Sequence, residues 1–196
     1  MKESFTQTYL TETAQIANSV SVKDIENVID LLRSVREQNG RVFILGVGGS
    51  AANASHAVND FRKLTNIEAY APTDNVSELS ARTNDEGWQN VFVPWLKVSK
   101  LSSRDCIFIL SVGGGNRKKQ VSVNICEAID YAKSVSAKIT GIVGRDGGYT
   151  ATNANSVIII PTLNTDSVTP HSESFQAILW HLMVSHPLLK INKTTW

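Results

Sequence analysis

Cysteine is scarce in this chain. Its 196 residues include two cysteines, Cys106 and Cys126, which are far apart and show no C-x-x-C spacing. The sequence therefore gives no basis for a disulfide framework or a cysteine-based metal site. We expect both residues to be buried free thiols that pack like small apolar side chains.

Long apolar runs are missing as well. No run approaches the ~20 apolar residues that are needed to cross a bilayer. Residues 1–5 lack the apolar core of a signal peptide. These absences predict a cytoplasmic protein with no membrane partner.

Neither sign of charge dominates. The chain has 19 Lys and Arg against 18 Asp and Glu, which gives a formal net charge of +1. Such a balance produces no general attraction to nucleic acid, although a local basic patch is compatible with it. We therefore expect no nucleic-acid partner.

The composition is that of a globular protein, with 42% hydrophobic and 19% charged residues. A chain of this length predicts a single domain, residues 1–196, with room for a sizeable core. Two helical patterns fill residues 1–40 and carry apolar stripes. These stripes must be buried, either on their own domain or, as we expect, in an oligomer interface.

Apolar runs alternate with helical patterns from residue 41 to residue 191. Within these runs, apolar and polar residues do not alternate strictly, which is typical of strands covered on both faces. We predict an α/β fold, a three-layer αβα sandwich with a mostly parallel five-stranded sheet. The predicted strands are 41–45, 67–71, 106–110, 138–143 and 157–160, the helices are 51–63, 92–96, 121–132 and 171–187, and the irregular segments are 73–87 and 161–170.

A glycine loop, Gly46-Val47-Gly48-Gly49-Ser50, joins the first predicted strand to a helix. Glycines allow a ligand to approach the backbone, and the free N–H groups at a helix start attract anions. The spacing is neither G-x-G-x-x-G nor a Walker A motif, and such turns also occur without a ligand. A second glycine turn, Ser111–Gly115, ends another strand, and ligands in such folds bind at the carboxyl ends of strands.

The helix after the first loop carries His56 and Asp60. Residues four apart share one helix face, so these two side chains lie close together. They suit proton transfer or metal binding, while a lone histidine on a helix is more often structural.

These features together resemble the sugar isomerase (SIS) domain family, and within it the phosphoheptose isomerases. The family reads G-N-G-G-S at the first loop, followed by a His and a Glu four apart. The family also has an N-D pair, a K-D-G-G turn and, on its last helix, a Gln and a His eight residues apart. Each of these has a counterpart in this chain. The matching residues here are Gly46–Ser50, His56, Asp60, Asn84, Asp85, Arg145–Gly148, Glu173 and His181.

The resemblance implies a homotetramer with active sites between subunits. It also implies a candidate zinc site formed by His56, Asp60, Glu173 and His181, with Asp60 and His181 as the acid/base pair. Residues eight apart on a straight helix are ~12 Å apart along its axis. Glu173 and His181 could therefore share one metal only if the helix starts late or they come from different subunits.

The resemblance further implies phosphate binding by the two glycine loops and their neighbours. The set carried over is Gly48, Gly49, Ser50, Asn84, Asp85, Ser111, Gly113, Gly114, Gly115, Asn116 and Arg117. The family's second loop usually reads S-T-S-G-N-S, but here Ser111 is followed by glycines that offer backbone N–H groups. Arg117 and Lys118 could supply charge or form a solvated face. Val47 replaces the first-loop Asn, and Asp60 is one methylene shorter than Glu.

The expected activity is the interconversion of a ketose phosphate and an aldose phosphate. The resemblance favours sedoheptulose 7-phosphate and D-glycero-D-manno-heptose 7-phosphate. Two alternatives stay open. One is a non-catalytic protein of the same family that binds a sugar phosphate or a replication initiator, and the other is an isomerase of another sugar phosphate.

Overall fold

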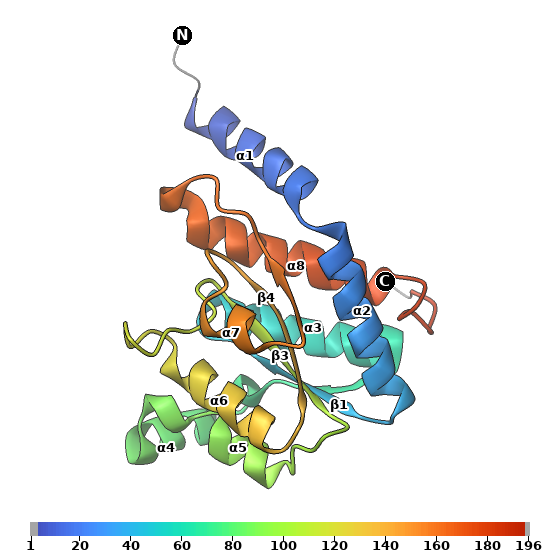
Figure 1. Ribbon diagram of the computed structural model, residues 1–196, viewed down its shortest axis with the longest axis vertical. Coiled ribbons are helices and arrows are strands. Elements are labelled where there is room, and N and C mark those ends of the chain that lie inside the picture. Colours follow the sequence, from blue (N-terminus) through green and yellow to red (C-terminus); the bar gives the residue numbers. More distant parts are fainter. Residues whose placement is uncertain (1–3, 195–196) are drawn as a thin grey trace.

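A parallel five-stranded sheet forms the centre of the part of the chain that the structure describes, residues 4–194 (Figure 1). The structure is a computed structural model, and residues 1–3 and 195–196 lie outside the described range, including part of the segment expected to lack a signal core. The strand order is β2-β1-β3-β4-β5, and every neighbouring pair is parallel. The strands are β1 (Arg41–Leu45), β2 (Glu68–Tyr70), β3 (Cys106–Ser111), β4 (Lys138–Val143) and β5 (Ser156–Ile159).

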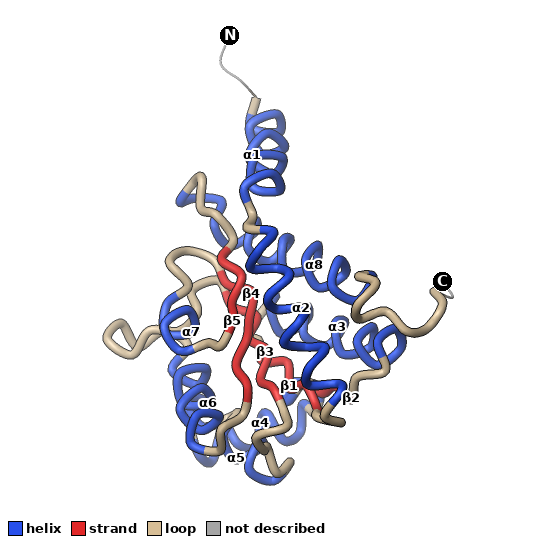
Figure 2. The backbone as a smooth tube through the Cα atoms, turned by 45° about the vertical axis from the view of Figure 1, so that its right-hand side comes forward, coloured by secondary structure: helices blue, strands red, loops and turns tan. Residues whose placement is uncertain are grey.

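Helices cover both faces of this sheet, so the predicted three-layer sandwich is confirmed. One buried cluster joins α2, α3 and α8 to one face, and a second joins α5 and α6 to the other. Figure 2 shows the sheet between these two groups of helices. The helices are α1 (Phe5–Ser19), α2 (Val22–Glu37), α3 (Gly49–Thr65), α4 (Val76–Glu86), α5 (Val93–Val98), α6 (Val123–Ser134), α7 (Gly148–Asn153) and α8 (Val168–Ser185).

Strand β3 shows why the apolar runs become central strands. All six of its residues are buried, because both of its faces are covered by helices. Cys106 lies in this strand and Cys126 in α6, and both are buried free thiols, as expected. Burial raises the pKa of the Cys106 thiol and so favours its protonated form.

The strand order reverses between β1 and β3. The chain passes from β1 to β2 on one side and then returns to place β3 on the other side of β1. A parallel sheet opens a crevice at such a point, next to the carboxyl ends of the two strands. The glycine loop at residues 46–50 follows β1, and the glycine turn at 113–115 follows β3, so both flank this crevice.

Two segments expected to be irregular are partly helical. Residues 73–87 contain α4, which buries none of its residues and so lacks an apolar periodicity. Asn75 caps it by accepting hydrogen bonds from the backbone N–H groups of Ser77 and Glu78. The segment 161–170 already contains the first turn of α8, which begins at Val168. The prediction of a loop was wrong for these parts.

Helix α1 projects away from the sheet (Figures 1 and 2). Ile16 is its one buried residue in the described range, while Phe5 is 79% exposed and Leu10 57%. Glu12 connects α1 to the rest of the fold, because its carboxylate lies 2.9 Å from Nε2 of the buried His171 on α8. Along residues 4–194, no helix combines the length and the apolar character that crossing a membrane requires.

Candidate active site

The first glycine loop turns sharply into α3. Gly48 has φ 63° and ψ −128°, a conformation that side chains with a Cβ rarely adopt. No side chain caps the helix start, and the space beside Gly48 is open. The N–H groups at the start of α3 therefore have no side-chain cap from this loop, and they favour negative charge.

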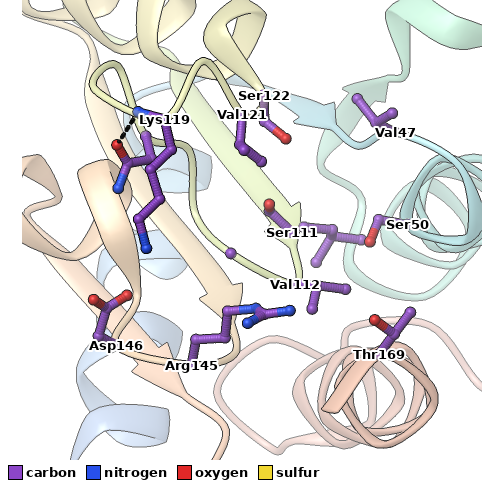
Figure 3. Close-up of a pocket in the computed structure, with 13 residues that line it drawn as sticks. Val47, Ser50, Ser111, Val112, Lys119, Val121, Ser122, Arg145, Asp146 and Thr169 are labelled. Atoms are coloured by element: carbon purple, nitrogen blue, oxygen red, sulfur yellow. Dashed lines mark hydrogen bonds between the residues drawn. The ribbon is translucent and has the colours of Figure 1, made fainter. Parts of the chain in front are cut away.

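A cavity of about 660 Å³ lies at the carboxyl ends of β1, β3 and β4 (Figure 3). Its walls come from both glycine loops, the loop after β4, and the first turn of α8. This is where the topology predicts a ligand site. The lining residues are Val47, Ser50, Leu110, Ser111, Val112, Gly113, Asn116, Lys119, Val121, Ser122, Arg145, Asp146 and Thr169.

The three glycines of the second loop have different roles. Gly113 lines the cavity, and the nearest atom to a Cβ added there is Cδ of Arg145 at 3.9 Å. Gly114 packs against the carbonyl of Gly147 and has no room for a Cβ, and its N–H donates to Oγ of Ser111 at 3.0 Å. A Cβ on Gly115 would lie 2.8 Å from Sγ of Cys126. Gly113 is therefore the open position, and the N–H of Gly114 is engaged within the loop.

Arg117 is turned away from the cavity. Its guanidinium forms ion pairs with Glu127 at 2.6 Å and with Asp130, and it lies 5.3 Å from the centre of the Tyr149 ring. Hydrogen bonds from this group, led by the one to Glu127, raise its pKa. Arg117 is thus held by α6 and α7 and does not line the pocket, although the sequence reasoning placed it on the phosphate.

Two other cations line the cavity instead. Arg145 follows β4 and points its guanidinium toward Ser111, and Lys119 reaches in from the loop before α6 (Figure 3). Arg145 has φ 53°, which is uncommon for a residue with a side chain and marks positions worth examining for function. The turn at Arg145 has a counterpart in the family pattern, but neither Lys119 nor Arg145 belongs to the site residues predicted from the sequence.

Asn84 and Asp85 lie elsewhere. Both are exposed at the end of α4, where Nδ2 of Asn84 donates to Oδ1 of Asp85 at 2.7 Å. Neither residue lines the cavity of this chain.

A second group of polar side chains lies further along α3 and α8. Asp60 is buried, and its Oδ2 lies 3.8 Å from Nε2 of His56 and 3.7 Å from Nε2 of His181. One ligand atom from each of the three residues falls within 4.8 Å of the others. The two imidazoles are 60% and 46% exposed, so the group is open to solvent on one side.

The orientation of His181 follows from one hydrogen bond. Its Nδ1 lies 2.8 Å from the carbonyl oxygen of Ala177, which can only accept. Nδ1 therefore carries the proton, and in the neutral ring Nε2 presents a lone pair toward Asp60. Trp180 stacks on the His181 ring at 3.5 Å and contacts the His56 ring edge-on at 4.7 Å, so the fully buried indole supports both imidazoles.

This group has the donor set of a catalytic zinc site, with three protein ligands and one open position. Tetrahedral bonds of ~2.1 Å place neighbouring ligand atoms ~3.4 Å apart. The Asp60 oxygen lies 3.7 and 3.8 Å from the two imidazole nitrogens, close to that value, and all three ligand atoms lie within 4.8 Å of one another. His56, Asp60 and His181 therefore fit a zinc ion.

Glu173 does not join them. Helix α8 begins at Val168, so a late helix start is ruled out, and Glu173 and His181 are ~12 Å apart along the axis. The Glu173 carboxylate instead lies beside Gly49, where an added Cβ would collide with it. Asn53 holds this region together by donating to the Glu173 carbonyl at 2.9 Å and to the Gln176 side chain at 3.0 Å.

Comparisons with known proteins identify the family of the chain. The phosphoheptose isomerase of Aeromonas hydrophila is 29% identical over 191 residues, 93% of this chain and 92% of its own length. The lincomycin biosynthesis protein LmbN of Streptomyces lincolnensis is 34% identical over 167 residues, and the match covers 80% of this chain but 59% of LmbN. The solved structure of the phosphoheptose isomerase GmhA from Neisseria gonorrhoeae has the same fold, with a TM-score of 0.77, 24% identity, and coverage of 90% and 93% of the two chains. The SIS domain profile matches residues 8–144, and this chain belongs to the SIS domain family.

Proposed function

We propose that this protein is an aldose–ketose isomerase of a phosphorylated sugar. The substrate pair that we put forward is sedoheptulose 7-phosphate and D-glycero-D-manno-heptose 7-phosphate, because phosphoheptose isomerases match nearly the whole chain. The structural observation that supports catalysis is the buried Asp60 carboxylate between two imidazole Nε2 atoms.

Isomerisation needs a group that removes a carbon-bound proton next to a carbonyl and returns it to the neighbouring carbon. Asp60 and the unprotonated Nε2 of His181 are both acceptors, and either can hold the proton at that stage. The Ala177 carbonyl keeps the His181 ring in the tautomer that can accept it. The cavity beside the second glycine loop holds the far end of the sugar and so positions it for reaction.

His56, Asp60 and His181 are the residues that would hold zinc. When bound, zinc acts as a Lewis acid toward a carbonyl oxygen or the negative charge that develops on it. Asp60 and His181 then serve as ligands, and their part in proton transfer is reduced accordingly.

We also propose a homotetramer in the cytoplasm. The apolar side chains of Phe5 and Leu10 on α1 are exposed, as are those of Ile178 and Leu182 on α8, and a subunit interface would cover them. In such an assembly, Glu173 could approach the metal group of a second subunit. Light scattering after size-exclusion chromatography measures the oligomer directly.

Incubation with sedoheptulose 7-phosphate, with and without added zinc, tests the activity, and NMR detects the aldose that forms. Elemental analysis of the same sample gives the metal content. Formation of the heptose phosphate supports the proposal. If the folded protein with zinc supplied binds the sugar phosphate but does not convert it, the assignment changes to a non-catalytic binder or to an isomerase of another sugar phosphate.

A further inference from the structure

We infer that Lys119 and Arg145 bind the phosphate group of the ligand, and that the turn which carries Lys119 positions this side chain for that contact. The inference relies on the proposed function for the class of ligand, a sugar phosphate. It assigns recognition of that phosphate to two charged side chains that line the cavity.

The turn at residues 116–121, named here the 116–121 hairpin, has a defined shape. Asn116 and Val121 form an antiparallel bridge, with N–H to O distances of 2.8 and 3.0 Å. The Asn116 side chain accepts a hydrogen bond from the backbone N–H of Lys119 at 2.9 Å, which is the dashed line in Figure 3. The backbone beneath Lys119 is therefore fixed, and its side chain is directed into the cavity.

Arg117 fastens this hairpin to the body of the protein. Its ion pairs with Glu127 and Asp130 reach α6, and its carbonyl accepts a hydrogen bond from the Gln120 side chain at 2.7 Å. Arg117 and Lys119, which lie on the same hairpin, thus have different roles. Arg117 is neutralised by two carboxylates and positions the hairpin, while Lys119 lines the cavity.

The charges that line the cavity are unbalanced. In the described residues, neither the Lys119 ammonium nor the Arg145 guanidinium has a hydrogen-bond or ion-pair partner. Asp146 is the acidic lining residue, and its Oδ1 accepts from the Gly148 N–H at 3.1 Å. Two unpaired cations against one acid attract an anion, and a phosphate dianion matches both charges with charge-assisted hydrogen bonds.

The hydroxyls and the open backbone complete the same wall. Oγ of Ser111 already accepts from the Gly114 N–H, so its own proton is free to donate to a ligand. Gly113 beside it has no side chain to exclude a phosphate, and a Cβ added there would lie 3.9 Å from Cδ of Arg145. On the first loop, in contrast, the Glu173 carboxylate lies beside Gly49 and opposes a second negative charge there. The phosphate therefore belongs near Lys119 and Arg145.

Calorimetric titration with inorganic phosphate and with sedoheptulose 7-phosphate tests this inference on Lys119→Gln, Arg145→Gln and the double variant. A charge-assisted hydrogen bond contributes about 1.5–3 kcal/mol, so each single change should weaken binding about tenfold or more, and the double change about 100-fold. Lys118→Gln is the matched control, because it removes the same charge from the same hairpin at an exposed residue that does not line the cavity. It should bind both ligands within about twofold of the wild type.

The outcomes separate this inference from the proposed function. If the double variant binds both ligands as the wild type does, or if the wild type binds neither, the phosphate assignment is wrong. If the double variant turns over the sugar phosphate with an unchanged KM, the phosphate assignment to Lys119 and Arg145 is wrong, while the proposed isomerase activity stands. Weakened binding in the two single variants, in a protein that converts no sedoheptulose 7-phosphate, supports the assignment while the isomerase proposal fails.

Discussion

Nε2 of His181 lies 3.7 Å from Oδ2 of Asp60, and Nδ1 of the same ring is held by the Ala177 carbonyl at 2.8 Å. We expect His181→Gln to lower kcat by about 10²–10⁴-fold, because the amide cannot take up a proton. Binding of inorganic phosphate should persist, since His181 does not line the cavity. Steady-state kinetics and calorimetry measure the two effects.

His186→Gln is the control for that change. His186 follows α8 and lies 3.6 Å from Glu26, away from the Asp60 group. It should keep wild-type kinetics and a wild-type zinc content, whereas His181→Gln should lose bound zinc. Wild-type rates in the His181 variant would remove that residue from the mechanism.

Glu173→Gln should strengthen the binding of phosphorylated ligands. The change keeps the size of the side chain and removes a negative charge beside Gly49, at the N-terminus of α3. A carboxylate at a helix N-terminus is stabilised by about 0.3–1 kcal/mol, so Glu173 competes with a ligand anion there, and its removal should lower the Kd about two- to fivefold. Titration at low ionic strength gives the largest difference. The exposed Glu37→Gln on α2 controls for net charge, and weaker binding in the Glu173 variant would contradict the expectation.

Gly113 and Gly114 are adjacent but should respond differently to alanine. At Gly113 the nearest atom is 3.9 Å from an added Cβ, so Gly113→Ala should fold normally and weaken phosphate binding by narrowing the cavity. Gly114 has φ 65° and abuts the Gly147 carbonyl, so Gly114→Ala should lower the free energy of unfolding by about 1–3 kcal/mol through strain alone.

Urea unfolding of the two glycine variants, followed by circular dichroism, distinguishes these effects. The expected order of stability is wild type, then Gly113→Ala close to it, then Gly114→Ala. A reversal of the two variants would show that the loop adopts another conformation.

Asp105 should make stability depend on acidic pH. Burial raises the pKa of its carboxyl, but hydrogen bonds from Arg41 and Ser102 outweigh that effect and hold the pKa below its ordinary value. The folded state therefore binds this proton less readily than the unfolded state. The stabilisation is present above the unfolded pKa of about 3.9 and is lost as the pH falls through the folded pKa.

Asp105→Asn tests this dependence. It should lower the free energy of unfolding at pH 7 by about 1–3 kcal/mol, because charge-assisted hydrogen bonds are lost. The difference from the wild type should shrink as the pH falls below about 4. Asp30→Asn, on an exposed pair with Arg33, provides the comparison, and an Asp105 variant whose deficit stays constant down to low pH would argue against the linkage.

The fold was largely predictable because its strands are buried on both faces. Strands β1 and β4 have the predicted bounds, and their apolar runs reflect cover by helices on each side. Helix α4 was missed because it buries nothing and carries no apolar period. Its signals are polar, namely the Asn75 cap and the ion pairs of Arg82 with Glu78 and Glu86. Short helix α7 is fixed by contacts that its own residues do not reveal, such as Thr150 donating to the Gly114 carbonyl.

The site was predictable where spacing along one helix determines it, as for His56 and Asp60. The position of Arg117 depends on partners 10 and 13 residues away, which no local pattern shows. Lys119 and Arg145 come from loops after two different strands, so their meeting in one cavity follows from the sheet order and not from their neighbours in sequence.

Helices α3 and α8 run side by side in the same direction, from Gly49 beside Glu173 to Asp60 beside His181. From Ser50 at the cavity to Asp60, the helix rises by ~15 Å. The cavity and the Asp60 group of one chain are therefore further apart than the carbon chain of a heptose phosphate can span. In the proposed homotetramer, a sugar phosphate held at the cavity of one subunit would instead meet the Asp60 group of another subunit, so an isolated subunit would bind the ligand without converting it.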